Sequence, residues 1–339
     1  GLARPRCRYR GVLHRTDTQL DIPSNIKKDL ESIYYYNIKR NTKLASALRA
    51  IVDSFNNNNL DILPFKGLIL SDYLYHVSAF RNISDLDFLI KWEQYDQVIQ
   101  LLESLGYDHH YEPGEEQRSL HFHFRSSTEL YHKESRLLIE PHWRLFDGYF
   151  PEPASNAQLF ARAVDYRLDG ISTKNLDDYS LLLLLCIHPA RHNWDNLVSW
   201  VDLAQFVLNH YELDWDRTLY RVKRDGAMGM VATAMQMIRA AFNIELPSEM
   251  GPFLDSSSRR LAVFFTELQA ASLCNPSSPS HGNALAINIR LRRRWREKIR
   301  YLKYMLTPKR PELQTVHLPQ PLFFLYYIIR FFRVIKLLF

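Results

Sequence analysis

The strongest constraint on the fold is an apolar run that carries two aspartates, Ile83-Ser84-Asp85-Leu86-Asp87-Phe88-Leu89-Ile90. In a β-strand, residues i and i+2 share a face, so a strand here would turn both carboxylates to one side and Leu86 and Phe88 to the other. Two ionised carboxylates beside a hydrophobic core need cations, because unpaired charge is costly there. Paired acidic oxygens are typical ligands of Mg²⁺. The run therefore predicts a strand with an acidic face and indicates metal-dependent chemistry.

The composition is that of a globular protein. The 339 residues are 46% hydrophobic and 24% charged, enough for two domains or for one domain with a large extension. A net charge of +6 favours polyanions without identifying one. The cysteines at positions 7, 186 and 274 are odd in number and far apart, which fits a reducing cytoplasm and no disulfide framework. The basic N-terminus has no apolar segment after it and does not read as a secretory signal.

Periodicity and turn residues predict an α+β fold, in which a small mixed β-sheet with flanking helices is followed by a mostly helical domain. Four parts are expected: a basic flexible leader (1–22), an α/β domain with a helical lead-in (23–150), a helical domain (151–275), and a basic helix with an aromatic C-terminal helix (276–339).

Within the α/β domain, strands are expected at 60–65, 83–90, 119–126 and 135–141, with helices over 23–58, from 66 onward and over 95–105. Beyond it, helices are expected at 177–190, 194–210, 215–241, 256–272 and 285–306.

A third carboxylate follows the acidic run. Glu140 lies in the apolar stretch 137–143, and a strand there, placed beside the first, would bring it to the face of Asp85 and Asp87. Three carboxylates from two strands can hold two divalent ions about 3.5 to 4 Å apart, the spacing used for in-line attack on phosphorus. Alternatively, Glu140 pairs with an arginine such as Arg81 or Arg144.

A basic glycine turn precedes the acidic run. Lys66-Gly67 follows one expected strand and opens a helix, whose free N–H groups and positive dipole end favour an anion such as a triphosphate. Gly67 would permit close approach and Lys66 would add charge. A glycine after a strand is also a common plain turn, so the motif gains weight only from its place upstream of the aspartates.

Taken in order, these motifs resemble the nucleotidyltransferase superfamily of the DNA polymerase β type. They are Phe65-Lys66-Gly67, then Arg81-Asn82-Ile83-Ser84-Asp85-Leu86-Asp87, then the strand of Glu140 followed by His142-Trp143. The sequence is more closely similar to a bacterial nucleotidyltransferase-like family with Lys-Gly, Arg-x-x-Ser-Asp-x-Asp and acid-x-His-Trp signatures. One departure is Leu68, where the superfamily usually has Gly or Ser; Lys66 or Ser71 could substitute for it.

The resemblance implies an enzyme that transfers a nucleoside monophosphate from an NTP to an acceptor hydroxyl, with pyrophosphate released. Asp85, Asp87 and Glu140 would bind Mg²⁺ or Mn²⁺ and carry catalysis. Residues assigned to the nucleotide are Lys66, Gly67, Arg81 and Ser84. A phosphotransferase using the same metals is a second enzymatic interpretation, but no Walker loop or kinase signature is present. The non-enzymatic alternative is a catalytically silent nucleotidyltransferase fold that acts as a binding or membrane-associated partner.

Two histidines stand four residues apart in the helical half, in His188-Pro189-Ala190-Arg191-His192. This spacing suits zinc, yet the metalloprotease glutamate and a third ligand are missing. The other interpretations are a polar lining of the cleft, made by His142, His188, Arg191 and His192, and a hydrogen-bonded structural role. His121 and His123 are expected on an exposed strand face.

The C-terminal region is basic and aromatic. A cluster of seven cations could bind nucleic acid or anionic lipid, or form a solvated helix face: Arg290, Arg292, Arg293, Arg294, Arg296, Lys298 and Arg300. Arg330, Arg333 and Lys336 interrupt the greasy tail 322–339, which makes it a poor membrane span. Packing of this tail on the domain is favoured over a position at a membrane surface. The expected location is the cytoplasm, with peripheral membrane contact through these helices as the alternative.

Overall fold

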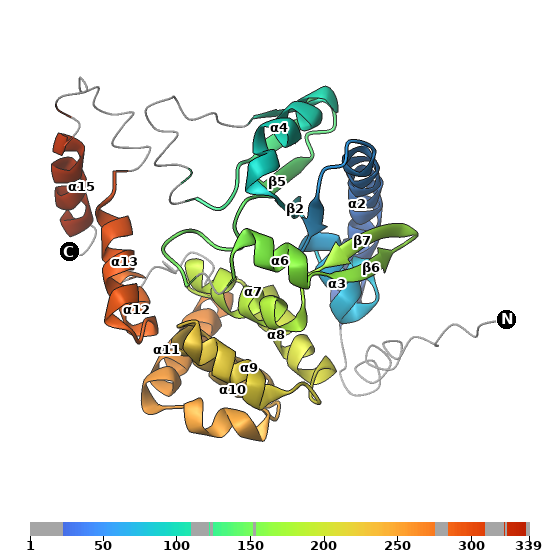
Figure 1. The fold of residues 1–339 in the computed structure, drawn as a ribbon. Helices are drawn as coiled ribbons and strands as arrows, with labels where there is room; N and C mark the ends of the chain where they lie inside the picture. The colour runs from blue at the N-terminus through green and yellow to red at the C-terminus, as the bar shows by residue number, and fades with distance from the viewer. Residues whose placement is uncertain are drawn as a thin grey trace. The chain divides into compact units, whose positions relative to one another are not determined.

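The computed structural model describes residues 23–109, 122, 125–151, 154–274, 284–308, 322 and 324–336 (Figure 1). The chain divides into two compact units. The first is drawn from Gly1–Tyr111, Glu129–Pro141 and Val164–Asn175, and the second from Glu112–Thr128, His142–Ala163 and Leu176–Phe339.

A five-stranded sheet forms the centre of the first unit, in the order β1-β2-β5-β4-β3. The pairs β1–β2, β3–β4 and β4–β5 are antiparallel, and Leu63 lies opposite Leu89 in the first of them. The strands are β1 (Ile62–Pro64), β2 (Asp85–Ile90), β3 (Tyr107–His109), β4 (Leu130–His132) and β5 (Leu138–His142). The sheet with its flanking helices confirms the predicted α+β fold class.

Helix α2 (Ser24–Asn57) runs as one helix through the region where one or two were expected. Its second half supplies Leu44, Leu48, Ile51 and Phe55 to the core, where the Phe55 ring packs edge-on against Phe88 of β2. The remaining helical elements of this unit are α3 (Gly67–Tyr75), η1 (Ser78–Phe80), η2 (Trp92–Gln94) and α4 (Tyr95–Ser104).

A hairpin that the sequence did not predict joins the first unit. It consists of β6 (Val164–Leu168) and β7 (Ile171–Asn175), and β7 contacts β1 and α2. Its periodicity is weak because only Leu168, Ile171 and Asn175 are buried. The strand expected at 119–126 falls mostly outside the described residues, as do His121 and His123.

Helices dominate the second unit, as predicted. They are α6 (Asn156–Arg162), α7 (Asp178–Arg191), α8 (Leu197–Asn209), α9 (Trp215–Arg224), α10 (Met228–Phe242), η3 (Ser248–Phe253), α11 (Ser256–Cys274), α12 (Ala284–Leu291), α13 (Trp295–Leu306) and α15 (Phe324–Lys336). No helix in the described part of the chain combines the length and apolarity needed to cross a bilayer.

Two helices predicted as continuous are each divided. The expected helix 215–241 breaks between α9 and α10, where Gly226 adopts a φ of +83° that favours glycine. The expected helix 285–306 breaks between α12 and α13, where Arg294 is extended (φ −90°, ψ 137°). At the first break the low helix propensity of Gly226 was the available signal, whereas the second lies among arginines, which favour helices, so propensity alone did not reveal it.

Candidate functional site

The two aspartates lie on β2 as predicted, in different surroundings. Asp85 is the first residue of the strand and is partly exposed, whereas Asp87 is only 6% exposed. The Lys66 ammonium, which precedes α3, lies 2.9 Å from Asp87 Oδ1. Side-chain exposure is 16% for Lys66 and 4% for Asp87, so this ion pair is largely removed from solvent. The Lys66 ammonium therefore pairs with Asp87, at the position where the sequence predicted a metal ion.

Glu140 lies on β5, the strand next to β2 in the sheet. His142 ends the same strand, at the point where the second unit begins. One ligand atom from each of Asp87, Glu140 and His142 falls within 4.8 Å of the others, and this is the only such metal-type group found among the described residues. The predicted approach of Glu140 to the aspartate strand is present in the structure. His142 offers a ring nitrogen to this group, and its predicted role in lining the cleft stays a prediction.

The electrostatics at this place favour a cation. Burial, followed by the neighbouring charges of Asp87 and Glu140, raises the pKa of Asp85 from 3.8 to about 6, against the opposing effects of Lys66 and a hydrogen bond with Ser84. Carboxylate oxygens are ligands that suit Mg²⁺ or Mn²⁺, whereas an imidazole nitrogen is more typical of transition-metal sites. The residues present thus fit a divalent ion by both chemistry and spacing.

The glycine turn lies against the acidic strand. Gly67 has a φ of +53°, and a Cβ there would lie 3.2 Å from Ile83 Cγ2 and 3.3 Å from the Asp85 carbonyl oxygen. Glycine therefore allows the start of α3 to approach the beginning of β2 closely. Arg81 Nη1 donates to the Gly67 carbonyl at 3.3 Å, which joins two of the residues assigned to the nucleotide.

Leu68 stands where the superfamily usually has Gly or Ser, and Ser71 was suggested as a substitute. Both side chains point inward. Leu68 is 2% exposed and belongs to the hydrophobic core of the first unit. Ser71 is fully buried, and its hydroxyl donates to the Val77 carbonyl at 3.2 Å. The Leu68 side chain is therefore part of the core, and the Ser71 hydroxyl is engaged within the fold. Of the two suggested substitutes, Lys66 is the one beside the acids.

Helix α2 holds the loop that leads into β2, a role the sequence reading missed. Asn37 Nδ2 donates to the Ala79 carbonyl at 3.1 Å, and Asn41 Nδ2 donates to the Arg81 carbonyl at 3.0 Å. Arg40 Nη2 donates to the Ser84 carbonyl at 3.2 Å. Asn37 and Asn41 are buried, four residues apart on the packed side of α2. Two such polar residues on an otherwise apolar face were the available signal.

The histidine motif belongs to the second unit. The rings of His188 and His192, near the end of α7, have centroids 5.8 Å apart. Arg191 Nε lies 3.4 Å from Asp147 Oδ2, and the other oxygen of Asp147 accepts from the Ser126 amide and hydroxyl. No third zinc ligand accompanies the histidines in the described ranges. The cleft-lining role of His188, Arg191 and His192 stays a prediction.

Part of the basic cluster is engaged within the second unit instead of forming one solvated face. Arg292 is 1% exposed; it donates to the Asn288 carbonyl and stacks over Tyr301 at 4.2 Å. Arg293 pairs with Asp255 at 2.8 Å, and Arg294 donates to two carbonyls at the end of α9. These three arginines fasten the α12–α13 junction to its neighbours.

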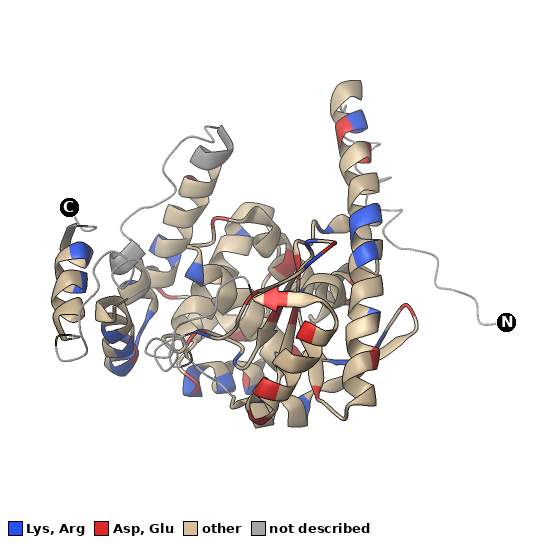
Figure 2. Ribbon diagram, turned by 90° about the horizontal axis from the view of Figure 1, so that it is seen from above, with Lys and Arg blue, Asp and Glu red and all other residues tan. Residues whose placement is uncertain are grey.

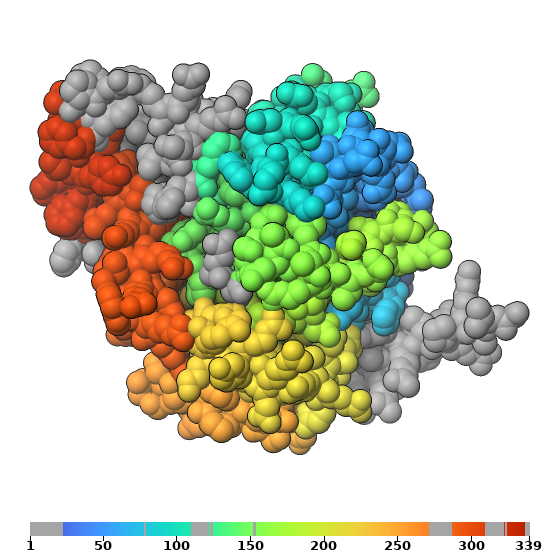
Figure 3. Space-filling view, viewed as in Figure 1, coloured from blue at the N-terminus to red at the C-terminus, as the bar shows by residue number. Residues whose placement is uncertain are grey.

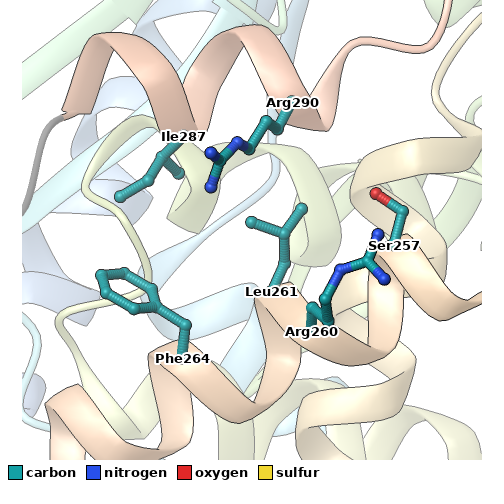
Figure 4. A pocket seen from close by; sticks show the side chains of 6 residues that line it. All are labelled: Ser257, Arg260, Leu261, Phe264, Ile287 and Arg290. Carbon is teal, nitrogen blue, oxygen red and sulfur yellow. The ribbon is translucent and has the colours of Figure 1, made fainter.

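A separate cavity of about 510 Å³ lies between α11 and α12 (Figure 4). Its lining is apolar with two arginines: Ser257, Arg260, Leu261, Phe264, Ile287 and Arg290. None of the residues assigned to metal or nucleotide belongs to it.

The crystal structure of ANT(2″)-Ia in complex with adenylyl-2″-tobramycin matches with 11% identity and a TM-score of 0.39, covering 54% of this chain and 97% of that one. A solution structure of the antibiotic-resistance factor ANT(2″)-Ia matches with 12% identity and a TM-score of 0.40, covering 54% and 91%. The search of curated proteins gave no match. The model of a family described as uncharacterised nucleotidyltransferase matches residues 9–243, more than half of the chain. The chain therefore belongs to this nucleotidyltransferase family, as the motifs predicted.

Proposed function

We propose that the protein is a metal-dependent enzyme that transfers a nucleoside monophosphate from an NTP to an acceptor hydroxyl and releases pyrophosphate. The observation that carries the proposal is that carboxylate oxygens of Asp87 and Glu140, on neighbouring strands, lie within 4.8 Å of each other, while both acids act on Asp85 and raise its pKa. Membership of a nucleotidyltransferase family supports the reaction type. A silent fold kept only for binding would have no need of crowded carboxylates, because such a cluster costs stability.

The three carboxylates would hold Mg²⁺ or Mn²⁺, and His142 offers an additional nitrogen. When bound, such an ion neutralises phosphate charge and makes an acceptor hydroxyl easier to deprotonate. Asp87 is the more buried of the two aspartates and Asp85 the more accessible. Asp85 therefore lies where it can face both an ion and a substrate.

The reaction itself is a single displacement. The acceptor oxygen forms a bond to the α-phosphorus, the bond from this phosphorus to the bridging oxygen breaks, and pyrophosphate leaves with the electron pair. The hydroxyl proton passes to the Glu140 carboxylate, which acts as the general base. The protein contributes orientation and a concentrated negative field that collects cations and the phosphates they accompany.

Lys66 and the start of α3 would receive the triphosphate. The free N–H groups at the start of a helix attract anions, and Gly67 lets them lie beside β2. With an ion held at Asp87, the Lys66 ammonium would be available to bind a phosphate oxygen. Arg81, bonded to the Gly67 carbonyl, adds charge at the same turn, and Ser84 precedes the first acid.

The direct test uses NTPs labelled at the α-phosphate, with Mg²⁺ or Mn²⁺, and with protein, sugar, small-molecule and RNA acceptors. Label transfer and pyrophosphate release are expected for the wild type and not for Asp87→Asn. The matched control is Asp53→Asn, which removes an equal charge from an exposed position of α2 and should retain activity.

Metal binding is measured separately by Mn²⁺ titration. Label transfer by Asp87→Asn at the wild-type rate would overturn the catalytic assignment. Wild type that binds neither Mn²⁺ nor NTP, and transfers no label, would instead favour the silent-fold alternative.

A further inference from the structure

Helix α13 carries an exposed apolar stripe. Trp295, Ile299, Leu302 and Leu306 follow one another at intervals of four, three and four, which places them on one helical face. They are 66%, 42%, 38% and 37% exposed. The buried face of the same helix is supplied by other residues, including Tyr301 at 5% exposure. The stripe therefore faces away from the core that the helix already covers, as surfaces used for association do.

Cations border this stripe. At about 100° per residue, Lys298 falls on one side of it, while Arg296 and Lys303 fall on the other. The only acid of α13 is Glu297, which is buried. Figure 2 shows Lys and Arg residues on the two helices nearest the C-terminus. The exposed face of α13 is thus an apolar strip between positive margins.

Helix α15 adds a second apolar face beside the first. It contacts α13, and the two lie side by side in Figure 3. Arg330 Nε donates to the Met305 carbonyl at 2.9 Å, and Tyr326 and Val334 are buried on the same side. No acid occurs in α15. The exposed side chains of α15 are 47% to 65% accessible and mostly aromatic: Phe324, Tyr327, Ile328, Phe331 and Phe332.

Nucleic acids and anionic phospholipid bilayers both bind basic surfaces, and the exposed apolar side chains favour one of the two. Nucleic acid recognises cations, but exposed Ile and Leu add little to a phosphate backbone. The arginines at the α12–α13 junction bind carbonyl and carboxylate groups of the protein itself. The cations that border the stripe on α13 are therefore next to exposed apolar side chains. A bilayer of anionic phospholipid takes both: aromatic and aliphatic side chains enter its interface while Lys and Arg remain at the headgroups.

We propose that α13 and α15 bind the surface of anionic phospholipid bilayers and lie in the plane of the interface. Trp295 and the tyrosine and phenylalanine rings of α15 would reside at headgroup depth, where aromatic residues are favoured. This surface is independent of the proposed chemistry on β2 and β5. Binding would concentrate the protein at a membrane surface.

Vesicle flotation of the full chain tests the proposal. We expect binding to phosphatidylcholine vesicles that contain phosphatidylglycerol, weak binding to phosphatidylcholine alone, and loss at high salt because the charges are exposed. Ile299→Ser/Leu302→Ser should weaken binding by about tenfold or more, since two apolar side chains leave the interface. The matched control is Val198→Ser/Val201→Ser on α8, a pair with the same spacing at 42% and 40% exposure, which should bind as wild type does.

The cations are tested with Arg296→Gln/Lys298→Gln/Lys303→Gln, which should weaken binding to the anionic vesicles by about fivefold per charge removed. Lys28→Gln/Lys39→Gln/Lys43→Gln lowers the net charge equally on α2, where all three side chains are exposed, and should have a much smaller effect. Vesicles of brominated lipid should quench wild-type tryptophan fluorescence more than that of Trp295→Phe.

Three results would overturn the proposal. The first is wild type that does not float with anionic vesicles. The second is an α13 double variant that is folded by circular dichroism and binds as tightly as wild type. The third is wild type that does not bind vesicles but binds RNA or self-associates, with the stripe variants abolishing that binding or the self-association seen by light scattering. This result would assign the surface to nucleic acid or to a second copy.

Discussion

At the scale of single residues, Asp85 and Asp87 are separated by one residue but lie in different electrostatic surroundings. Asp87 is buried against the Lys66 ammonium, whereas Asp85 is raised to a pKa of about 6 by burial and by Asp87 and Glu140. A raised acid pKa means that the folded, metal-free protein holds a proton that the unfolded chain releases nearer pH 3.8. The stability of the metal-free protein should therefore decline as pH rises through about 6, while the affinity for cations grows.

The first prediction concerns this titration. Because the proposed metal site uses the Asp85 carboxylate, the apparent Mn²⁺ affinity should rise by up to about tenfold per pH unit below pH 6 and level off above it. Mn²⁺ titrations followed by electron paramagnetic resonance measure this. Asp85→Asn should bind more weakly and lose this part of the pH dependence. Equal wild-type affinity at pH 5 and pH 7 would contradict the prediction.

The second prediction concerns Lys66. Lys66→Met leaves the buried Asp87 charge without its ammonium, which should lower the free energy of unfolding of the metal-free protein by about 3 kcal/mol. The same variant should bind Mn²⁺ more tightly, because the competing cation is gone, and bind NTP more weakly. Urea denaturation and separate Mn²⁺ and NTP titrations measure the three effects. Lys91→Met, which breaks an exposed pair with Asp61, is the control and should change little.

At the scale of elements, the start of α3 depends on one glycine. Gly67→Ala would force a left-handed φ on a residue with a Cβ and crowd Ile83 and the Asp85 carbonyl. The expected cost is about 1–2 kcal/mol of unfolding free energy, together with weaker Mn²⁺ binding as β2 shifts. Gly251→Ala, where a Cβ would meet nothing within 4 Å, should be nearly neutral in the same urea denaturation. A neutral Gly67→Ala would show that the turn is not constrained as described.

The elements that the sequence predicted are those with a strong pattern. Strand β2, the turn at Gly67 and helix α4 follow from alternation, from a glycine after an apolar run and from helical spacing. The hairpin β6–β7 escaped because its strands bury few side chains, and β3 and β4 are three residues each. At the site, Asp85, Asp87, Glu140 and Lys66 were named from sequence. The hydrogen bonds from Asn37 and Asn41 of α2 were not predicted, because they join residues about forty positions apart in the sequence.

At the scale of the whole molecule, ion binding and stability are linked. A ligand that binds only the folded state stabilises it, by about 2.7 kcal/mol at a hundredfold excess over the dissociation constant. Mn²⁺ should therefore raise the thermal transition of the first unit in wild type and in Asp53→Asn, and not in Asp87→Asn. Differential scanning calorimetry measures this, and a chain with two units need not melt in one step. An equal shift in Asp87→Asn would place the ion elsewhere.

The family match ends within the second unit of the fold and does not reach the C-terminal helices. The matched residues end at 243, so α11, α12, α13 and α15 all follow them. The residues proposed for nucleotidyl transfer lie within the match, and the proposed lipid surface lies beyond it. The chemistry can thus be shared across the family, whereas the lipid surface would be a property of chains that carry these last helices.

Helix α2 has a consequence for how genetic variation in this protein should be interpreted. Asn37, Arg40 and Asn41 bind the backbone segment that leads into β2, although none of them belongs to the proposed metal or nucleotide site. A substitution at any of them can impair turnover while every acid stays intact. Inactive variants that map to α2 would accordingly report on the alignment of the acids and would be a poor guide to where the acceptor is recognised.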